Sequence, residues 1–567
     1  MRRIDWDNRT EAIAGILYTR EITNNLPYYM IVYTEDGGMD FESVRRNGRV
    51  AYIAHNTGRE FICDEVEKLI KKVSEIMKEK NANDEKALEI TFSITVDKEI
   101  IIHNIDECKA LNGKSRLMTD KEFMDTKSLA KCTYLDNSCI LSDSAVWKIG
   151  LVLGNDPRPL DFSLFDELFA PEIWSKSIGS IGYMADSTPM QQKVGNKPYV
   201  SLKSIFESML PANLPEQFKY RITEYYEKKL RDNRKLHSTV DDDILMSVYT
   251  FTTASDMEKL KGENFSDDEI EVWKKALYKI THRAVAGYDD VIAADKFMLD
   301  RMKKARDRVL AEKPMEATNV MKLYKYISEM LTEVKNTVVL CYLKHGIYAG
   351  IGEQIIKSAV SIGILDDAQT NKYLNNLDAT IAEFATSVLK LDKGELSREQ
   401  FDSVYGQISP RYYDIRTACF KDMSVADIIS VCGEELLECA KELEVSKDNI
   451  TIDKAALQDA LDKADFTFTA EKLLDYTEKS IKFREKIKFE YAESLGLVLD
   501  IIKRFGDLHG IAMEDMSYLD INELLGYHSR DAYIQIIEER RNMYHSYSYL
   551  KLPGLIFDVG DIDVIEN

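Results

Sequence analysis

From about residue 140 to residue 547, apolar residues recur every three or four positions in one long segment after another. This spacing places the apolar side chains on one face of an α-helix, and it constrains the fold more than any other feature. We expect helices over residues 214–235, 241–260, 266–312, 317–345, 350–364, 367–390, 397–407, 423–444, 453–463 and 469–508, with a last pair within 521–547. Glycine and proline number only 26 and 11, so few residues interrupt these segments. The sequence therefore predicts a mainly α protein.

The first 105 residues have a different pattern, because β-branched and aromatic residues are concentrated in short runs separated by turn residues. The runs are AIAGILYT (12–19), LPYYMIVYT (26–34), RVAYIAH (49–55) and LEITFSITVDKEIIIHNI (88–105). The last run predicts a hairpin with its turn near Asp97 and Lys98, and residues 64–80 have helical spacing. We predict a small α+β lobe over 1–110, a connector and the start of the helical region over 111–215, and a large multi-helix domain over 216–567.

Composition excludes several classes of partner. Asp and Glu outnumber Lys and Arg by 97 to 75, which gives a net charge of −22, and a polyanion of this size repels nucleic acid and acidic lipid. No apolar run approaches the roughly 20 residues of a membrane-spanning helix, and the N-terminus lacks the apolar stretch of a signal peptide. Eight scattered cysteines without a CxxC pair are typical of free thiols in a reducing compartment. We expect a cytoplasmic protein.

Strong catalytic signatures do not occur in the sequence. It has no GxxxxGK[ST], GxSxG, HExxH or GxGxxG motif. Its eight histidines show no metal-ligand spacing, so we predict no metal centre built from His and Cys.

The most informative helix covers residues 469–510. Arg484 and Lys488 occupy positions in its apolar stripe, one turn apart. Because a buried charge costs several kcal/mol unless it is paired, two alternatives follow. The two cations pair with Glu485, Glu490 or another acidic neighbour, or they form a cationic floor for a phosphate or carboxylate ligand.

Three further segments carry candidate residues. In YGQISPRYYDIR (405–416), Arg411, Asp414 and Arg416 lie in a loop between helices, where they form either an anion clamp or a surface ion pair. In HSTVDDD (237–243), the aspartates follow Thr239 as in a helix N-cap, and magnesium binding is the alternative. In PRP (157–159), two prolines fix the backbone around Arg158, which suits either packing or presentation of the side chain.

Several segments, in order along nearly the whole chain, resemble one known family. They are AGILYTREITNNLPYYMIVY (14–33), the run 88–105, PRPLDFSLFDELF (157–169), GNKPYVSLKSIFESMLPANL (195–214), YGQISPRYYDI (405–415) and KFREKIKFEYAESLGLVLDII (482–502). Together they resemble the phosphoenolpyruvate synthase and pyruvate dikinase family of PEP-utilising enzymes, especially members like rifampicin phosphotransferase. In that family an ATP-grasp module phosphorylates a histidine on a swivelling domain, and that histidine phosphorylates an acceptor held elsewhere.

The resemblance implies a location for each part of the chemistry. The lobe 1–110 resembles the C-terminal part of the ATP-grasp module, and the helical domain resembles the acceptor-binding region. ATP and Mg²⁺ are the implied cofactors and a small molecule is the implied acceptor. The implied nucleotide-lobe positions are Thr19, Arg20, Thr91 and His103. The implied acceptor or anion-binding positions are Arg158, Lys203, His237, Arg411, Asp414, Arg484, Glu485 and Lys488.

Departures from the family pattern fall on polar positions. Thr91 replaces a metal-binding glutamate, while His103 and Ile105 replace a glutamine and an arginine. A hydroxyl supplies none of the negative charge that Mg²⁺ favours, and isoleucine cannot hold a phosphate. Lys203 stands where the family has arginine, and Gln407 replaces a histidine. The sequence also lacks the family's first ATP-grasp lobe and its phosphohistidine domain, so we expect no complete phosphotransfer cycle from the chain alone.

Three hypotheses follow. In the first, the chain is the central part of an ATP-dependent phosphotransferase, and separate polypeptides supply the missing ATP lobe and phosphohistidine domain. It predicts a cationic pocket formed by Arg158, Lys203, Arg411, Arg484 and Lys488. In the second, the chain is a non-catalytic binding, regulatory or scaffold protein of the same fold, and these side chains are scattered or neutralised by carboxylates. In the third, it is a fragment of a longer gene product.

Overall fold

A computed structural model describes residues 12–35, 40–55, 57, 63–80, 87–111, 118–134, 139–145, 148–185, 188–377, 379–433 and 452–566. The chain forms two compact units. The first contains Met1–Gly150, Gln191–Leu202 and Arg541–Asn567, and the second contains Leu151–Met190 and Lys203–Arg540. The expected domains 1–110, 111–215 and 216–567 stay a prediction. The two units do not follow these expected bounds, because the hairpin at 191–201 and the C-terminal segment pair with strands of the first 150 residues.

The first unit contains a six-stranded antiparallel sheet in the order β10-β3-β2-β1-β4-β5. Its strands are β1 (Ile13–Tyr18), β2 (Tyr28–Thr34), β3 (Arg49–Ala54), β4 (Leu88–Ile94), β5 (Ile100–Glu107) and β10 (Val564–Glu566). The four predicted strand runs and the hairpin turn are confirmed, and Lys98 has φ +66° in that turn. β10 is the exception, because sequence reasoning assigned no strand to the C-terminal segment.

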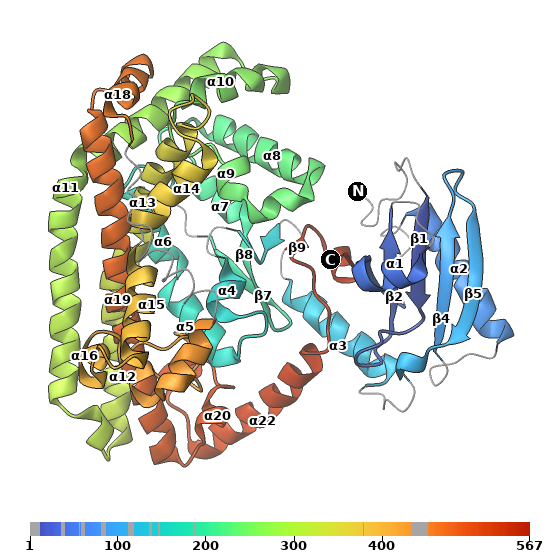
Figure 1. Cartoon of the computed structure of the whole chain (residues 1–567). Helices are drawn as coiled ribbons and strands as arrows, with labels where there is room; N and C mark the ends of the chain where they lie inside the picture. The colour runs from blue at the N-terminus through green and yellow to red at the C-terminus, as the bar shows by residue number, and fades with distance from the viewer. Residues whose placement is uncertain are drawn as a thin grey trace. The chain divides into compact units, whose positions relative to one another are not determined.

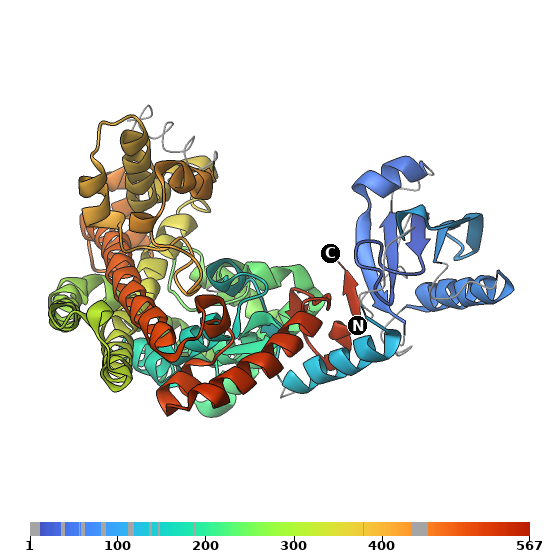
Figure 2. The same cartoon turned by 90° about the horizontal axis from the view of Figure 1, so that it is seen from below.

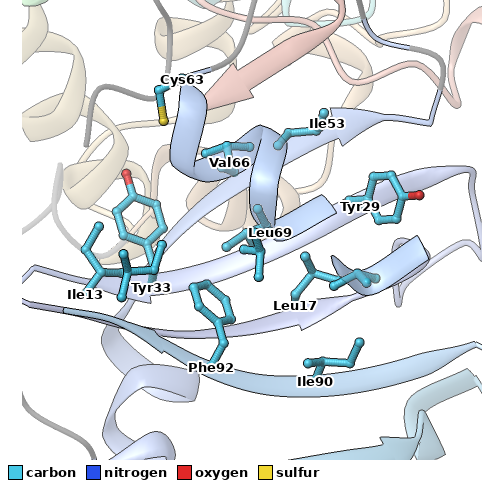
Figure 3. Packing of buried hydrophobic residues seen from close by; sticks show 14 of the residues in the cluster. Ile13, Leu17, Tyr29, Tyr33, Ile53, Cys63, Val66, Leu69, Ile90 and Phe92 are labelled. Atoms are coloured by element: carbon cyan, nitrogen blue, oxygen red, sulfur yellow. The ribbon is translucent and has the colours of Figure 1, made fainter. Parts of the chain in front are cut away.

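Each face of this sheet is covered by a helix. On one face, α2 (Asp64–Glu79) packs Val66 and Leu69 against sheet residues that include Leu17 and Phe92 (Figure 3). On the other face, Val44 of α1 (Phe41–Asn47) joins a separate apolar cluster with alternating residues of β1 and β2. This in-and-out alternation is what the strand period of two residues predicts. The mixed α+β character of the N-terminal lobe is therefore confirmed.

The first unit also contains a four-stranded sheet for which the sequence analysis predicted no strand. Its residues lie in the predicted connector 111–215 and in the predicted multi-helix domain 216–567. Its order is β7-β8-β6-β9, formed by β7 (Gln191–Val194), β8 (Lys197–Ser201), β6 (Leu141–Ser142) and β9 (Leu555–Ile556). Gly195 and Asn196 form the two-residue turn between β7 and β8, and Gly195 has φ +55°, where glycine is favoured. The remaining elements are η2 (Lys109–Leu111), α3 (Asp120–Thr133) and η8 (Val559–Ile562), and α4 (Ile149–Leu153) begins in the first unit and ends in the second.

The second unit consists mostly of helices, as the sequence predicts. Two of them, α11 (Asp267–Ala311) and α19 (Ala470–His509), lie side by side, and α12 and α13 also pack on α19 (Figures 1 and 2). The others are α5 (Pro159–Leu168), α6 (Pro171–Gly179), α7 (Leu202–Ser208), α8 (Glu216–Asp232), η3 (Arg234–Ser238), α9 (Val240–Asp243), α10 (Thr253–Glu258), η4 (Lys259–Glu263), η5 (Pro314–Glu316), α12 (Val320–Val334), η6 (Lys335–Val339), α13 (Leu340–Ser358), α14 (Asp367–Leu377), α15 (Ala379–Asp392), α16 (Arg398–Tyr405), η7 (Phe420–Asp422), α18 (Lys454–Lys463), α20 (Met513–Met516), α21 (Ile521–Gly526) and α22 (Arg530–Tyr547).

The helix prediction is wrong at two places. The predicted helix 241–260 is interrupted between α9 and α10, because hydroxyl side chains bond to the backbone there. Thr281 accepts from the Tyr249 N–H, and Thr253 accepts from the Thr250 N–H. The predicted break at 345–350 is also wrong: the π-helical turn η6 joins α12 directly to α13, which runs on to Ser358. The part of the predicted helix 423–444 from residue 434 onward lies outside the described residues.

Candidate functional site

The helix α19 carries the pair of cations that the sequence singles out. Thr469 caps its N-terminus by accepting from the Lys472 N–H, and Gly510 ends it at φ +63°. Arg484 and Lys488 are partly buried, with side chains 21% and 34% exposed, and Glu485 between them is 6% exposed. The helix thus places two cations and a buried carboxylate on neighbouring turns.

Carboxylates pair with both cations. Arg484 donates from Nε to Glu485 Oε1 over 3.0 Å and from Nη1 to Glu353 Oε1 of α13 over 2.9 Å. Lys488 Nζ lies 3.6 Å from Glu485 Oε2. Glu490, the other predicted partner, instead pairs with Arg306 of α11 at 3.0 Å. Pairing, one of the two alternatives that the sequence left open, therefore describes this site, and the four charges sum to zero.

A pocket lies beside these charges, within the second unit. Its volume is about 220 Å³, and it is bounded by α15, the loop 408–412, η7 and α19. Its lining is mostly apolar and rich in aromatic rings: Phe384, Ile408, Pro410, Tyr412, Phe420, Val431, Phe489 and Ala492. The polar side chains in the lining are Ser409, Cys432, Glu485 and Lys488. Since a dry cavity of about 150 Å³ can bind benzene, this pocket has room for a one- or two-ring ligand.

The loop between α16 and η7 contributes one wall of the pocket and carries the second predicted cluster. Asp414 accepts from Arg416 Nε at 2.7 Å and from Arg416 Nη2 at 2.8 Å. Burial opposes the charged form, but these hydrogen bonds hold the pKa of Asp414 below its ordinary value. Arg411 is 75% exposed and lies 4.0 Å from Asp414. The predicted anion clamp is therefore an ion pair, formed mainly by Asp414 and Arg416.

Arg158 extends this ion-pair cluster, although it does not line the pocket. It forms the N-cap position of α5, donates to Glu514 Oε1 at 2.9 Å and to the Tyr518 hydroxyl, and lies over the Tyr518 ring. Arg416 Nη1 lies 3.8 Å from the same Glu514 carboxylate. Glu514 of α20 thus joins the arginine of α5 to the arginine of the loop.

Asp161 belongs to this cluster, and sequence reasoning missed it. Its side chain is 3% exposed, Oδ2 accepts from the Arg158 N–H at 3.0 Å, and Oδ1 has no hydrogen-bond partner within the described chain. Burial, helped by the neighbouring Asp414 carboxylate, raises the pKa of Asp161 to about 8. The available signal was an acidic residue in the third position of a helix that begins with proline, a pattern that capping alone explains.

The two remaining acceptor candidates are not among the residues that line the pocket. Lys203 lies in α7, where its charge acts on Glu227 of α8. His237 lies in η3, before α9. Arg158, Lys203 and Arg411 therefore do not join Arg484 and Lys488 in one cationic pocket, as the first hypothesis requires.

The four nucleotide candidates lie in the N-terminal lobe, where Thr19, Arg20 and His103 make side-chain contacts with the protein. Thr19 is buried and its hydroxyl accepts from the Leu88 N–H. Arg20 is 2% exposed. Its guanidinium donates to the side-chain oxygen and the backbone oxygen of Asn25 and to the Asp120 carboxylate. Thr91 is partly buried in β4, and His103 of β5 contacts the Ser93 hydroxyl at 2.8 Å. The arrangement commits the guanidinium of Arg20 to protein partners.

Neither a metal cluster nor a disulfide occurs in the part of the chain that the structure describes. No group of three or more His, Cys, Asp or Glu side chains there has the geometry to hold a metal ion. Asp242 of the predicted DDD segment instead pairs with Lys357 at 3.0 Å. None of the described cysteines forms a disulfide, and Cys439 lies outside the described residues. None of the described helices is both long and apolar enough to span a bilayer.

A buried polar network links α11 to α13, and the sequence analysis did not identify it. His345 contacts Asp295 through Nε2 at 2.8 Å and the Tyr288 hydroxyl through Nδ1 at 2.6 Å. Lys344 donates to Asp295 Oδ1 at 2.7 Å. Burial lowers the pKa of His345 and raises that of Cys341 to about 12. His345 is therefore a neutral imidazole and Cys341 a protonated thiol. We interpret the network as one that stabilises the packing of α11 against α13.

The comparisons with known proteins give no family for this chain: no protein-family model and no curated protein matches it.

Proposed function

We propose that the second unit binds a small ligand that combines an apolar ring with one acidic group, in the pocket between the loop 408–412 and α19. The observation that carries this proposal is the composition of the pocket wall. Most of the lining side chains are apolar or aromatic, four of them carry an aromatic ring, and Lys488 and Glu485 are the charged ones. Ligand pockets are typically apolar with a few placed polar groups, and the polar groups fix the orientation of the ligand.

The charges of the site support a ligand with a single negative charge. Arg484 is held by Glu353 and Glu485, so Lys488 is the cation that the described pocket wall can offer. Lys488 Nζ lies 3.6 Å from Glu485 Oε2, and in this proposal it turns toward the acidic group of the ligand. A nucleotide polyphosphate would bring several negative charges next to the buried Glu485 carboxylate, which disfavours it electrostatically. The pocket therefore suits an acceptor better than a nucleotide.

This proposal corresponds to the acceptor-binding role in a PEP-utilising phosphotransferase, with phosphoryl transfer dependent on other polypeptides. The support is that Glu485 and Lys488, two positions of the family resemblance, line the pocket. The second candidate is a non-catalytic binding protein of the same fold. It is favoured by the pairing of Arg158, Arg411 and Arg484 with carboxylates, which leaves little free positive charge to stabilise a transferring phosphoryl group.

Calorimetric titration with 2-naphthoate tests ligand binding. We expect Lys488→Met to weaken binding by roughly 10- to 100-fold, because a charge-assisted hydrogen bond contributes about 1.5–3 kcal/mol. Lys486→Met is the matched control, since Lys486 is exposed on the same helix and does not line the pocket. Equal affinity of Lys488→Met and the wild type would contradict the proposed role of Lys488.

Incubation with labelled ATP, pyruvate and Mg²⁺ separates binding from catalysis. For the purified chain we expect no phosphoenolpyruvate, no AMP and no acid-labile phosphohistidine, because Thr91 lacks a metal-binding carboxylate and Arg20 is committed to Asn25 and Asp120. Formation of any of these products would overturn this expectation. Transfer that occurs only after partner polypeptides are added would favour the acceptor-binding role over the non-catalytic one.

A further inference from the structure

The loop that forms one wall of the pocket is packed against α5 by a small set of contacts. Tyr413 meets the Phe165 ring of α5 edge-on, with ring centroids 5.4 Å apart, and its hydroxyl contacts that of Tyr491 in α19. The charge of the next residue, Asp414, acts on Asp161 of α5 and adds to the rise in pKa that burial causes there. Ser409, Pro410 and Tyr412 of the same loop line the pocket. These residues come just before Tyr413 in the chain. A movement of the loop at its contact with α5 would therefore also displace part of the pocket wall.

Two buried carboxyl groups, one on α5 and one on the loop, interact electrostatically. Asp161 and Asp414 are 3% and 7% exposed, so water screens their mutual repulsion poorly. The other charged and titratable groups in this cluster are Arg411 and Arg416 of the loop, Arg158 at the start of α5, Glu514 of α20 and Tyr518. The guanidinium groups of Arg158 and Arg416 are shared: Arg416 chelates Asp414, and both of these arginines lie near Glu514.

One of the two carboxyl groups can remain neutral. Asp414 accepts three hydrogen bonds from Arg416, including one from its backbone N–H, which favour the charged form of Asp414. Asp161 accepts one bond through Oδ2, and its Oδ1 has no hydrogen-bond partner among the residues described. A proton on Asp161 removes the repulsion between the two groups and avoids an uncompensated buried charge.

We propose that Asp161 is a proton-binding site that holds the loop 406–419 against α5, so that loss of this proton releases the pocket wall and weakens ligand binding. The sign follows from linkage. Asp161 keeps its proton to higher pH in the closed loop than in an opened one, so opening becomes more favourable as the pH rises. The statement about ligand binding rests on the proposed function, whereas the statement about the loop does not.

Hydrogen–deuterium exchange of peptides covering residues 406–419 tests the loop directly. At each pH from 6 to 9, the exchange rate of these peptides in the wild type is divided by their exchange rate in Asp161→Asn. The intrinsic pH dependence of amide exchange cancels in this ratio. We expect this ratio to rise by about tenfold per pH unit up to about pH 8 and then to level off. The ratio of Asp166→Asn to wild type should stay constant, because Asp166 is exposed on the same helix. A ratio of wild type to Asp161→Asn that is constant from pH 6 to pH 9 would overturn the proposal.

A second variant and a ligand titration complete the test. If Asp161→Asn does not fold, Asp414→Asn takes its place. It keeps the buried Asp161 but removes the Asp414 charge that adds to its raised pKa, so the ratio of wild type to Asp414→Asn should rise over a narrower pH range that ends at about pH 8. The affinity for 2-naphthoate should fall with pH in the wild type and stay constant in Asp161→Asn. Loop exchange that responds to pH without any change in affinity would refute the coupling to the pocket. Absence of 2-naphthoate binding at every pH would refute the proposed function, while loop exchange would still decide the role of Asp161.

Discussion

Replacing Asp295 by alanine is expected to lower the free energy of unfolding by about 3–5 kcal/mol, because it removes the acceptor at the centre of a buried network. Asp295 is 5% exposed and accepts from both His345 and Lys344. Burial opposes ionisation, but these bonds hold the pKa of Asp295 below its ordinary value, so the carboxylate is charged. Without it, the Lys344 ammonium, 16% exposed, and the His345 Nε2 lose their partner.

Urea denaturation followed by far-ultraviolet circular dichroism measures this loss. Asp300→Ala is the matched control, since Asp300 lies on the exposed side of the same helix and removes the same charge. We expect the control to change the free energy of unfolding by about 0.5 kcal/mol or less. A cost below about 1 kcal/mol for Asp295→Ala would contradict a supporting role for the network.

Replacing Asp563 by alanine is expected to have a comparable effect in the first unit. The Asp563 carboxylate, 7% exposed, contacts Lys127 and lies 2.7 Å from Lys131, both in α3. Lys127 is 3% exposed, so removal of Asp563 leaves a buried ammonium without its partner, a change that costs about 3–5 kcal/mol. The next residue begins β10, which pairs with β3, and we therefore expect the C-terminal strand to detach first.

The same pair gives a pH signature. Burial lowers the pKa of Lys127 to about 8, although Asp563 opposes the shift. Between this value and the ordinary lysine value the unfolded chain binds more protons, so the free energy of unfolding should rise with pH there. In Asp563→Ala the rise should begin at a lower pH. Urea denaturation of the wild type and of Asp563→Ala, at pH values from below 8 to the ordinary lysine pKa, measures this rise in the free energy of unfolding. Asp531→Ala is the control, because the Asp531 side chain is 98% exposed. Identical pH profiles for wild type and Asp563→Ala would contradict the pairing.

Local signals explain which parts of the fold could be predicted. The strands β1 to β5 alternate side chains between two covered faces, and α11 and α19 keep an apolar stripe over many turns, so their patterns are complete within the sequence. β10 has three residues and is fixed by pairing with β3 about 500 residues earlier, which no local pattern encodes. The interruption between α9 and α10 depends on Thr281 of another helix, so the local pattern of 241–260 pointed to the wrong structure.

The candidate site was predictable in part for the same reason. The positions of Arg484 and Lys488 on one stripe indicated that they needed partners, and Glu485 was identified as one of them. Glu353 could not be foreseen, because its contact depends on how α13 packs against α19. The pocket likewise depends on the packing of the loop 408–412 and Phe384 near α19. Asp161 has the sequence of a capping residue, and only its burial beside Asp414 distinguishes it.

A crystal structure of the protein with 2-naphthoate would show directly whether this pocket is the ligand site. We predict that the ring lies between Tyr412 and Phe489 and that the carboxylate lies about 3 Å from Lys488 Nζ, which has turned away from Glu485. Density for the ligand at another place, with Lys488 still directed at Glu485, would show that this pocket is not the binding site.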